Sequence, residues 1–291
     1  MMKPLTMAEI DAIELQEFLM VVGRPKGGKT HQVLEIAKHW AKKYPENIIH
    51  VIDLEGKILK EFKKRYSYLT NIEFWRCNEV HEPIEALHEI IPNIKLNDWL
   101  VVDSSSQMWE WAIDLAYEVV SGLTKNEYIS RFVAKNTGRN VAVTDSDDSG
   151  KMRGKKEHMK GVAPDPANLW QSASNTYSRN FMDVISRDVY GECHILIIAS
   201  EKMTSGRKAS SEAKKTKTNV LGDNLFIEGR PRDAYKADTI LYLLKEGEEW
   251  TAKVLGDYGY EGGGRELEFD ITDKCLWKAL KKNRKTRKDE D

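Results

Sequence analysis

The sequence predicts an α/β fold with a mainly parallel central sheet, helices on both faces and an antiparallel hairpin at one edge. Short apolar runs alternate with segments of helical period along most of the chain, which is typical of strands joined by crossover helices. The first apolar run leads through a glycine-rich turn into an amphipathic helix. Near the C-terminal end, two further runs flank a short turn at Gly247, which indicates a hairpin.

The composition suits one large domain. The 291 residues are 41% hydrophobic and 31% charged, with a formal net charge of −1, so we expect a single domain over 1–291. Near-neutrality excludes a chain that is basic throughout, but not local basic segments. No apolar run approaches the length that crosses a bilayer, and the N-terminal residues do not resemble a signal peptide. We therefore expect a cytoplasmic protein with no membrane partner. Three widely spaced cysteines argue against a disulfide framework or a zinc site.

The first part of the chain supplies four expected strands. The first covers Phe18 to Val22, and the helix after it carries apolar residues at helical spacing until Pro45. Further strands are expected at 47–55, 72–77 and 99–103. A helix with Pro83 in its first turn follows the third strand, and the serines at 104–106 cap a helix after the fourth. The apolar residues expected to mark that last helix are Met108, Trp111, Leu115 and Val119.

The second part of the chain is less regular. Residues 122–168 break the alternation and are expected to be an insertion, after which a helix carrying Ala173, Tyr177, Phe181 and Ile185 feeds a strand at 194–200. A polar basic segment at 202–235 is expected to be a mobile loop. The hairpin strands are expected at 238–244 and 249–255, with a further strand within 265–272. Asp273 is expected to cap a last helix, and 281–291 is expected to be a charged, frayed tail.

One motif carries the strongest chemical signal in the chain. Residues 23–30 match the pattern G-x-x-x-x-G-K-[ST] of a phosphate-binding loop, or Walker A motif, between the first strand and its helix. Successive backbone N–H groups of such a loop point inward around a polyphosphate, while Lys29 reaches the β/γ oxygens and the Thr30 hydroxyl reaches Mg²⁺. The sequence therefore predicts binding of ATP or GTP. The loop residues are Gly23, Arg24, Pro25, Lys26, Gly27, Gly28, Lys29 and Thr30.

Hydrolysis needs a carboxylate for the Mg²⁺ shell and a group that orients the attacking water. Asp103 ends an apolar strand, and the carboxyl ends of parallel strands line the ligand crevice. It is the candidate for the metal shell, with a helix-capping role as the alternative. Glu55 is the candidate for the group that orients the attacking water. The alternative is that Glu55 is only a solvated carboxylate at the end of a strand. Asp53 and Glu201 compete with it for that role.

The order of these segments resembles the RecA-like ATPases. The resemblance rests on the loop at 23–30, on Asp53-Leu54-Glu55, on Val101-Val102-Asp103-Ser104-Ser105 and on Ile197-Ile198-Ala199-Ser200-Glu201 before a basic segment. It is closest to compact phage and prophage proteins often described as AAA-domain or phage nucleotide-binding proteins, some of which assist single-strand annealing and recombination. The similarity covers roughly 18–255, and only the phosphate-binding loop is highly specific.

The resemblance implies an ATP- and Mg²⁺-dependent ATPase that acts on DNA. Lys29 and Thr30 would bind phosphates and metal, Asp103 would support Mg²⁺, and Glu55 would activate water. It also implies a homo-oligomer with nucleotide near the subunit boundaries and single-stranded DNA as a partner. Glu201 departs from the family, because many members have an uncharged or basic residue there that senses the γ-phosphate.

Basic segments are the candidates for contact with DNA. Lysine and arginine side chains neutralise nucleic-acid phosphates, although lysine-rich loops are often only solvated. The first cluster follows the strand at 194–200, the second lies in the insertion, and the weakest is the run at 281–288. Arg230 and Arg232 are candidates for arginine fingers that act on the nucleotide of a neighbouring subunit. The two clusters comprise Lys202, Arg207, Lys208, Lys214, Lys215 and Lys217, and Lys151, Arg153, Lys155, Lys156 and Lys160.

Two alternatives remain open at the level of the sequence. A viral DNA-packaging motor ATPase usually ends its metal-binding strand in Asp-Glu, whereas Ser104 follows Asp103 here. A nucleotide-dependent regulatory binding module with little hydrolysis would share the loop but would not need a group that activates water.

Overall fold

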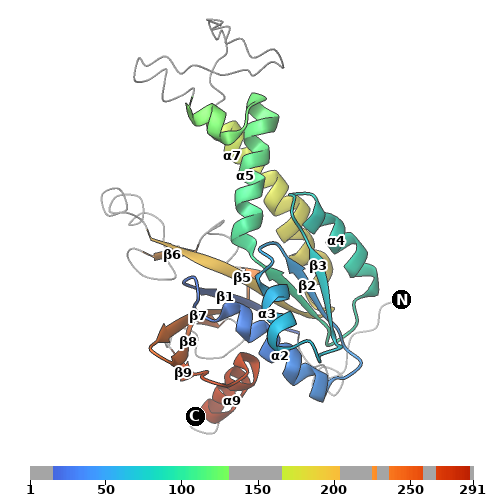
Figure 1. Ribbon diagram of the computed structural model, residues 1–291, viewed down its shortest axis with the longest axis vertical. Helices are drawn as coiled ribbons and strands as arrows, with labels where there is room; N and C mark the ends of the chain where they lie inside the picture. Colours follow the sequence, from blue (N-terminus) through green and yellow to red (C-terminus); the bar gives the residue numbers. More distant parts are fainter. Residues whose placement is uncertain (1–15, 131–165, 204–224, 228–235, 258–266, 289–291) are drawn as a thin grey trace, which may run out of the picture.

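The computed structural model describes residues 16–130, 166–203, 225–227, 236–257 and 267–288. Eight strands form one sheet in the order β3-β2-β4-β5-β1-β7-β8-β9, and β6 pairs with β5. Helices cover both faces of this sheet (Figure 1). The expected α/β class, with a mostly parallel sheet and an antiparallel edge, is confirmed among these residues.

The parallel part of the sheet comprises β1 to β5 and β7. Its strands are β1 (Phe18–Gly23), β2 (Ile49–Asp53), β3 (Ile72–Arg76), β4 (Trp99–Asp103), β5 (His194–Met203) and β7 (Thr239–Glu246). Every residue of β1, β2 and β4 is buried, as expected for strands that are covered on both faces. The antiparallel edge is formed by β7, β8 (Glu249–Asp257) and β9 (Leu267–Asp270).

Alternate residues of the strands face two separate hydrophobic cores. Phe18, Met20 and Val22 of β1 belong to one core, and Leu19 and Val21 belong to the other, because successive side chains of a strand point to opposite faces. The first core is covered by α4 (Glu82–Ile90), η1 (Ile91–Asn93), α5 (Ser105–Ser121), α7 (Pro166–Ser174) and the π-helical turns η2 (Asn175–Met182) and η3 (Ile185–Val189). The second is covered by α2 (Lys29–Lys43), α3 (Lys57–Arg65) and α9 (Leu276–Lys288). Part of α5 and α7 projects beyond the sheet as a paired arm (Figure 1).

Several local expectations differ from the structure in the first half of the chain. Helix α3 was not expected, because its sequence is dominated by charge and only Ile58 is fully buried. The buried face of α5 matches the expected one only in part: Met108 is buried as expected, Trp109 and Ala112 are buried as well, and Val119 is 68% exposed. Val119 lies near the end of α5, where the helix has left the sheet. Ser104 does cap α5, accepting a hydrogen bond from the Gln107 N–H.

The C-terminal half also departs from expectation at three places. The expected loop at 202–235 contains strand β6 (Leu225–Ile227), which pairs with Glu201–Met203 of a longer β5. Asp273 has a φ of 53° and lies outside α9, whose first N–H instead donates to the Gln32 side chain. The charged segment from 281 is helical through Lys288, where the sequence suggests a frayed end. Tertiary contacts supply these features, and local sequence does not encode them.

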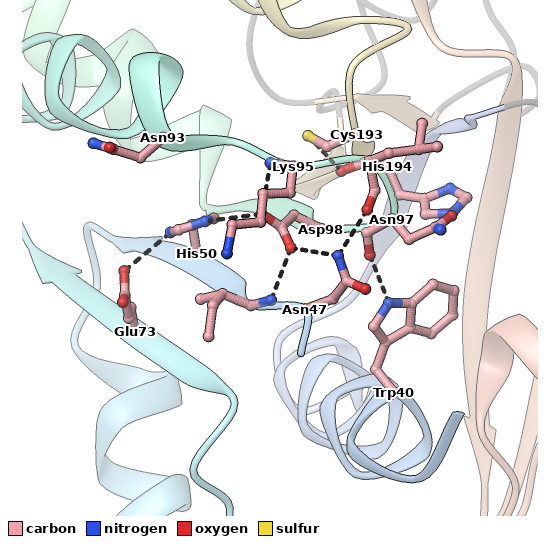
Figure 2. Close-up of polar contacts among 12 residues, drawn as sticks. Trp40, Asn47, His50, Glu73, Asn93, Lys95, Asn97, Asp98, Cys193 and His194 are labelled. Atoms are coloured by element: carbon pink, nitrogen blue, oxygen red, sulfur yellow. Dashed lines mark hydrogen bonds and ion pairs between the residues drawn. The ribbon is translucent and has the colours of Figure 1, made fainter. Parts of the chain in front are cut away.

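A buried polar network joins the amino ends of the parallel strands (Figure 2). The carboxylate of Asp98, which is 1% exposed, accepts hydrogen bonds of 2.8 Å from the Ile48 N–H, the Lys95 N–H and the Asn47 side chain. His50 Nε2 lies 3.6 Å from the same carboxylate. Burial alone would raise the pKa of Asp98, but the contact with His50 and these hydrogen bonds lower it below its ordinary value.

Candidate functional site

The carboxyl ends of four parallel strands bring the candidate residues to one edge of the sheet. Gly23 at the end of β1 pairs with Ser200 of β5, and Asp53 of β2 pairs with Asp103 of β4. Residues far apart in sequence therefore meet at this edge, as parallel connections require.

The loop at 23–30 joins β1 to α2 through a compact turn. The Gly27 N–H donates to the Arg24 carbonyl at 2.9 Å, and Lys26 and Gly28 adopt the left-handed region with φ of 65° and 87°. Among the described residues, no side chain caps the start of α2, and its first turn holds no acidic residue. The N–H groups and the positive end of the helix dipole are thus arranged to receive an anion.

The Lys29 side chain folds back over this loop. Its ammonium donates to the carbonyl oxygens of Gly23, at 2.5 Å, and Arg24, at 2.9 Å. Burial lowers the pKa of Lys29, and the nearby carboxylates of Asp103 and Glu55 oppose that shift. The cation is therefore held between the loop and the acidic strand ends.

Asp103 faces the start of α2. Its carboxylate is 3% exposed and accepts a hydrogen bond of 3.4 Å from the Thr30 hydroxyl. Burial raises the pKa of Asp103 to about 7, and the negative charges of Glu55 and Asp53 add to the shift. A hydroxyl and a carboxylate are ligands that Mg²⁺ accepts, and a divalent cation would offset the excess negative charge at this edge. The donor set therefore fits the implied metal.

Glu55 lies in the turn after β2 and is close to the end of β4. Its carboxylate accepts a hydrogen bond of 2.8 Å from the Ser104 hydroxyl and forms an ion pair with Lys57. Burial alone would raise the pKa of Glu55, but its contacts with Lys57 and Ser104 and the charge of Lys29 lower it. Glu55 is thus held ionised beside Asp103.

The two competing carboxylates are engaged elsewhere. Asp53 is fully buried and accepts hydrogen bonds from the Gly56 N–H at 2.7 Å and the Leu59 N–H at 3.2 Å. Glu201 forms an ion pair of 2.8 Å with Arg24 and accepts a hydrogen bond from Tyr242. Asp53 therefore stabilises the turn before α3. Glu201 on β5 connects the loop at 23–30, through Arg24, to Tyr242 on β7. Of the three carboxylates, Glu55 is the one whose side chain is hydrogen-bonded to Ser104, the residue that follows Asp103.

Lys57, Ser104 and Tyr242 were not identified as site residues from the sequence. Ser104 and Tyr242 contact carboxylates on other segments of the chain, Glu55 and Glu201. Lys57 pairs with the nearby Glu55, but it begins helix α3, which was not expected from the sequence. Ser104 was recognised only as a helix cap, because its cap role has a local signature and its contact with Glu55 does not.

The DNA and arginine-finger candidates lie almost wholly outside the described residues. The exceptions are Lys202, whose backbone belongs to β5 and pairs with Phe226 of β6, and the run at 281–288, which lies in α9. The candidates outside the described residues are Lys151, Arg153, Lys155, Lys156, Lys160, Arg207, Lys208, Lys214, Lys215, Lys217, Arg230 and Arg232.

No protein-family model matches the chain, and a search of curated proteins finds no significant match.

Within the described ranges, no group of three or more His, Cys, Asp or Glu residues could hold a metal ion. A phosphate-bound Mg²⁺ needs only one or two carboxylates, so this finding does not bear on Asp103. None of the helices in the described part of the chain is both long and apolar enough to span a bilayer.

Proposed function

We propose that this chain is a Mg²⁺-dependent ATPase that binds nucleotide at the carboxyl edge of its sheet. The observation that carries the proposal is the approach of the Thr30 hydroxyl to the Asp103 carboxylate at 3.4 Å, across 73 residues of sequence. This approach joins the end of a phosphate-binding loop to the end of a second parallel strand, which is the arrangement that a metal-bound triphosphate needs.

Each group has a distinct role in this proposal. The N–H groups of the loop and the Lys29 ammonium bind the phosphates and stabilise the charge that develops on them. Thr30 and Asp103 hold Mg²⁺, which when bound acts as a Lewis acid on the phosphoryl oxygens. Glu55, ionised because its pKa is lowered, orients the attacking water and accepts its proton.

The finer assignment to a RecA-like ATPase of the phage type remains part of the proposal. It is supported by the order of the phosphate loop, Glu55, the Asp103-Ser104 pair and Glu201, and by their meeting at one edge of a mostly parallel sheet. A viral DNA-packaging motor ATPase is disfavoured because Ser104, and not a glutamate, follows Asp103.

The variant Glu55→Gln separates an enzyme from a regulatory binding module. The amide keeps the hydrogen bond from Ser104 but cannot accept a proton, so we expect turnover to fall roughly 100-fold or more while ATP affinity changes little. Steady-state phosphate release and ATP binding by calorimetry measure the two quantities. Slow turnover in the wild-type protein that Glu55→Gln leaves unchanged would favour the regulatory module.

Action on DNA, and assembly with nucleotide between subunits, stay predictions because their candidate residues lie outside the described ranges. If 202–217 contacts a single strand, the logarithm of affinity falls against that of salt by about 0.7 per phosphate contact. The double variant Lys214→Glu/Lys215→Glu should flatten that slope and leave ATP binding unchanged. Fluorescent oligonucleotides in a salt series, with a non-hydrolysable ATP analogue, provide the measurement. Absence of binding by the wild type at low salt would contradict the role in recombination.

A further inference from the structure

A tryptophan from the antiparallel edge touches the phosphate loop. Trp250 on β8 packs against Gly28 so closely that a Cβ placed at Gly28 would lie 1.9 Å from Cζ3 of the indole. Gly28 also has a φ of 87°. The last turn of the loop therefore needs glycine both for its backbone conformation and because an aromatic ring occupies the adjacent space.

The sheet order places this ring on one definite side of the loop. Strand β1 lies between β5 and β7, with Asp103 of β4 beyond β5 and Trp250 of β8 beyond β7. A triphosphate with its terminal phosphate toward Asp103 and Thr30 therefore has its other end toward β7 and β8. The nucleoside would leave the loop on the side of Trp250.

Two hydrogen bonds to the segment that follows β9 fix the backbone of Trp250. Its N–H donates to the Thr272 hydroxyl at 2.8 Å, and its carbonyl accepts from the Ile271 N–H at 2.8 Å. The ring is half-buried against the core on the α2 side of the sheet. The backbone of Trp250 is thus held between β7, with which it pairs, and the segment after β9 before any ligand arrives, which limits the entropy lost on binding.

The outer part of the indole meets a cation. Lys245, directly opposite Trp250 on β7, places its Nζ 4.7 Å from the ring centroid. A cation at this distance is attracted by the electron-rich face of the ring. Lys245 is exposed. Its long, flexible side chain can move away, so that another planar group contacts this face of the Trp250 ring.

We propose that Trp250 is the stacking surface for the base of the bound nucleoside triphosphate, with a preference for purines. The inference rests on the proposed function, because it takes the triphosphate to lie in the loop at 23–30. A two-ring base overlaps an indole more fully than a one-ring base, and stacking on an aromatic side chain needs no hydrogen-bond partner.

The test compares ligands with and without a base in the full-length protein. Wild type, Trp250→Phe and Trp250→Leu are titrated with Mg²⁺-ATP, Mg²⁺-CTP and inorganic tripolyphosphate. Phenylalanine and leucine both keep an apolar side chain against Gly28, but only phenylalanine can stack. We expect Trp250→Leu to weaken ATP binding roughly tenfold, to reduce the preference for ATP over CTP, and to leave tripolyphosphate affinity unchanged. Trp250→Phe should retain most of the ATP affinity.

The outcomes separate this inference from the function on which it rests. Equal ATP affinity in the phenylalanine and leucine variants would overturn the stacking role, and so would an equal loss of ATP and tripolyphosphate binding, which would make Trp250 a support for the loop. If the wild type bound neither ligand, the proposed nucleotide site itself would be contradicted. Trp170→Ala, which removes an exposed tryptophan from the distant α7, is the matched control and should bind ATP as the wild type does.

Discussion

The two ends of strand β4 carry aspartates in opposite circumstances. Asp98, just before the strand, and Asp103, at its end, are 1% and 3% exposed. Asp98 accepts three hydrogen bonds of 2.8 Å, and its pKa is lowered. Asp103 accepts one longer hydrogen bond from Thr30; burial raises its pKa to about 7, and the charges of Glu55 and Asp53 add to the shift. Two aspartates with almost no exposed surface therefore have pKa shifts of opposite direction.

The difference distinguishes a structural edge of the sheet from the edge that carries the candidate site. At the amino edge, the charge of Asp98 is matched by donors within the fold, which stabilises the folded state. At the carboxyl edge, the carboxylates of Asp103 and Glu55 lie beside a lysine whose pKa is also perturbed. Perturbed groups that cluster at a strand edge are typical of a site that a ligand completes. Substitutions at the two edges should therefore affect different properties.

The largest expected effect is that of Lys29→Ala on activity. The change removes the cation that is proposed to contact the phosphates, so we expect kcat/KM for ATP to fall roughly 100- to 1000-fold and ATP affinity to fall with it. The melting temperature without nucleotide should change little. The control is Lys42→Ala on the exposed face of α2. Nucleotide affinity equal to that of the wild type would contradict the assignment of the loop.

The variant Asp103→Asn should have the next largest effect. It removes a negative charge from the proposed metal shell, so we expect Mg²⁺-dependent hydrolysis to fall roughly 100-fold, while nucleotide binding in EDTA changes much less. Parallel titrations of ATP with and without Mg²⁺ measure the difference. An equal loss under both conditions would indicate that Asp103 acts only in the fold.

The same carboxylate predicts an unusual dependence of stability on pH. Because the pKa of Asp103 is raised in the folded state, its contribution is fully present below its ordinary value of 3.8 and is lost as pH rises through about 7. In that interval the free energy of unfolding should decrease by about 1.4 kcal/mol per pH unit from this group. Urea unfolding without Mg²⁺ or nucleotide, from pH 5 to 8, measures the slope. It should be shallower in Asp103→Asn, and identical slopes would exclude the raised pKa.

The smallest expected effect on activity belongs to Asp98→Asn, which should instead destabilise the fold. An asparagine has one acceptor oxygen, so at least one donor among the Ile48, Lys95 and Asn47 groups would lose its partner. The expected cost is about 2 kcal/mol at pH 7. Because the pKa of Asp98 is lowered, its stabilisation is present above its ordinary pKa and is lost as pH falls through the folded value. Chemical unfolding and steady-state kinetics should show lower stability with unchanged kcat/KM. A loss of activity without a loss of stability would contradict the structural role assigned to Asp98.

Local sequence determined most of the architecture. Short, largely apolar runs predicted the positions of β1, β2, β4, β7 and β8 to within a few residues, because each buried strand must be apolar where it packs. The phosphate-loop candidate was also readable from sequence, since glycine and lysine at fixed spacing reflect backbone constraints within one turn. The strand end at Asp103 was readable because a charged residue directly follows the apolar run at 99–102.

Tertiary structure decided the features that depend on distant partners. Helix α9 continues through the charged segment at 281–288, and Arg284 in it donates to the Glu17 carboxylate, 267 residues away. Only strand pairing shows that Glu55 lies beside the end of β4. The contact between Gly28 and Trp250 likewise requires β7 and β8 to pair beside β1. Local sequence encodes backbone preference and burial, whereas the charge that surrounds a buried carboxylate is set by segments that meet only in the folded chain.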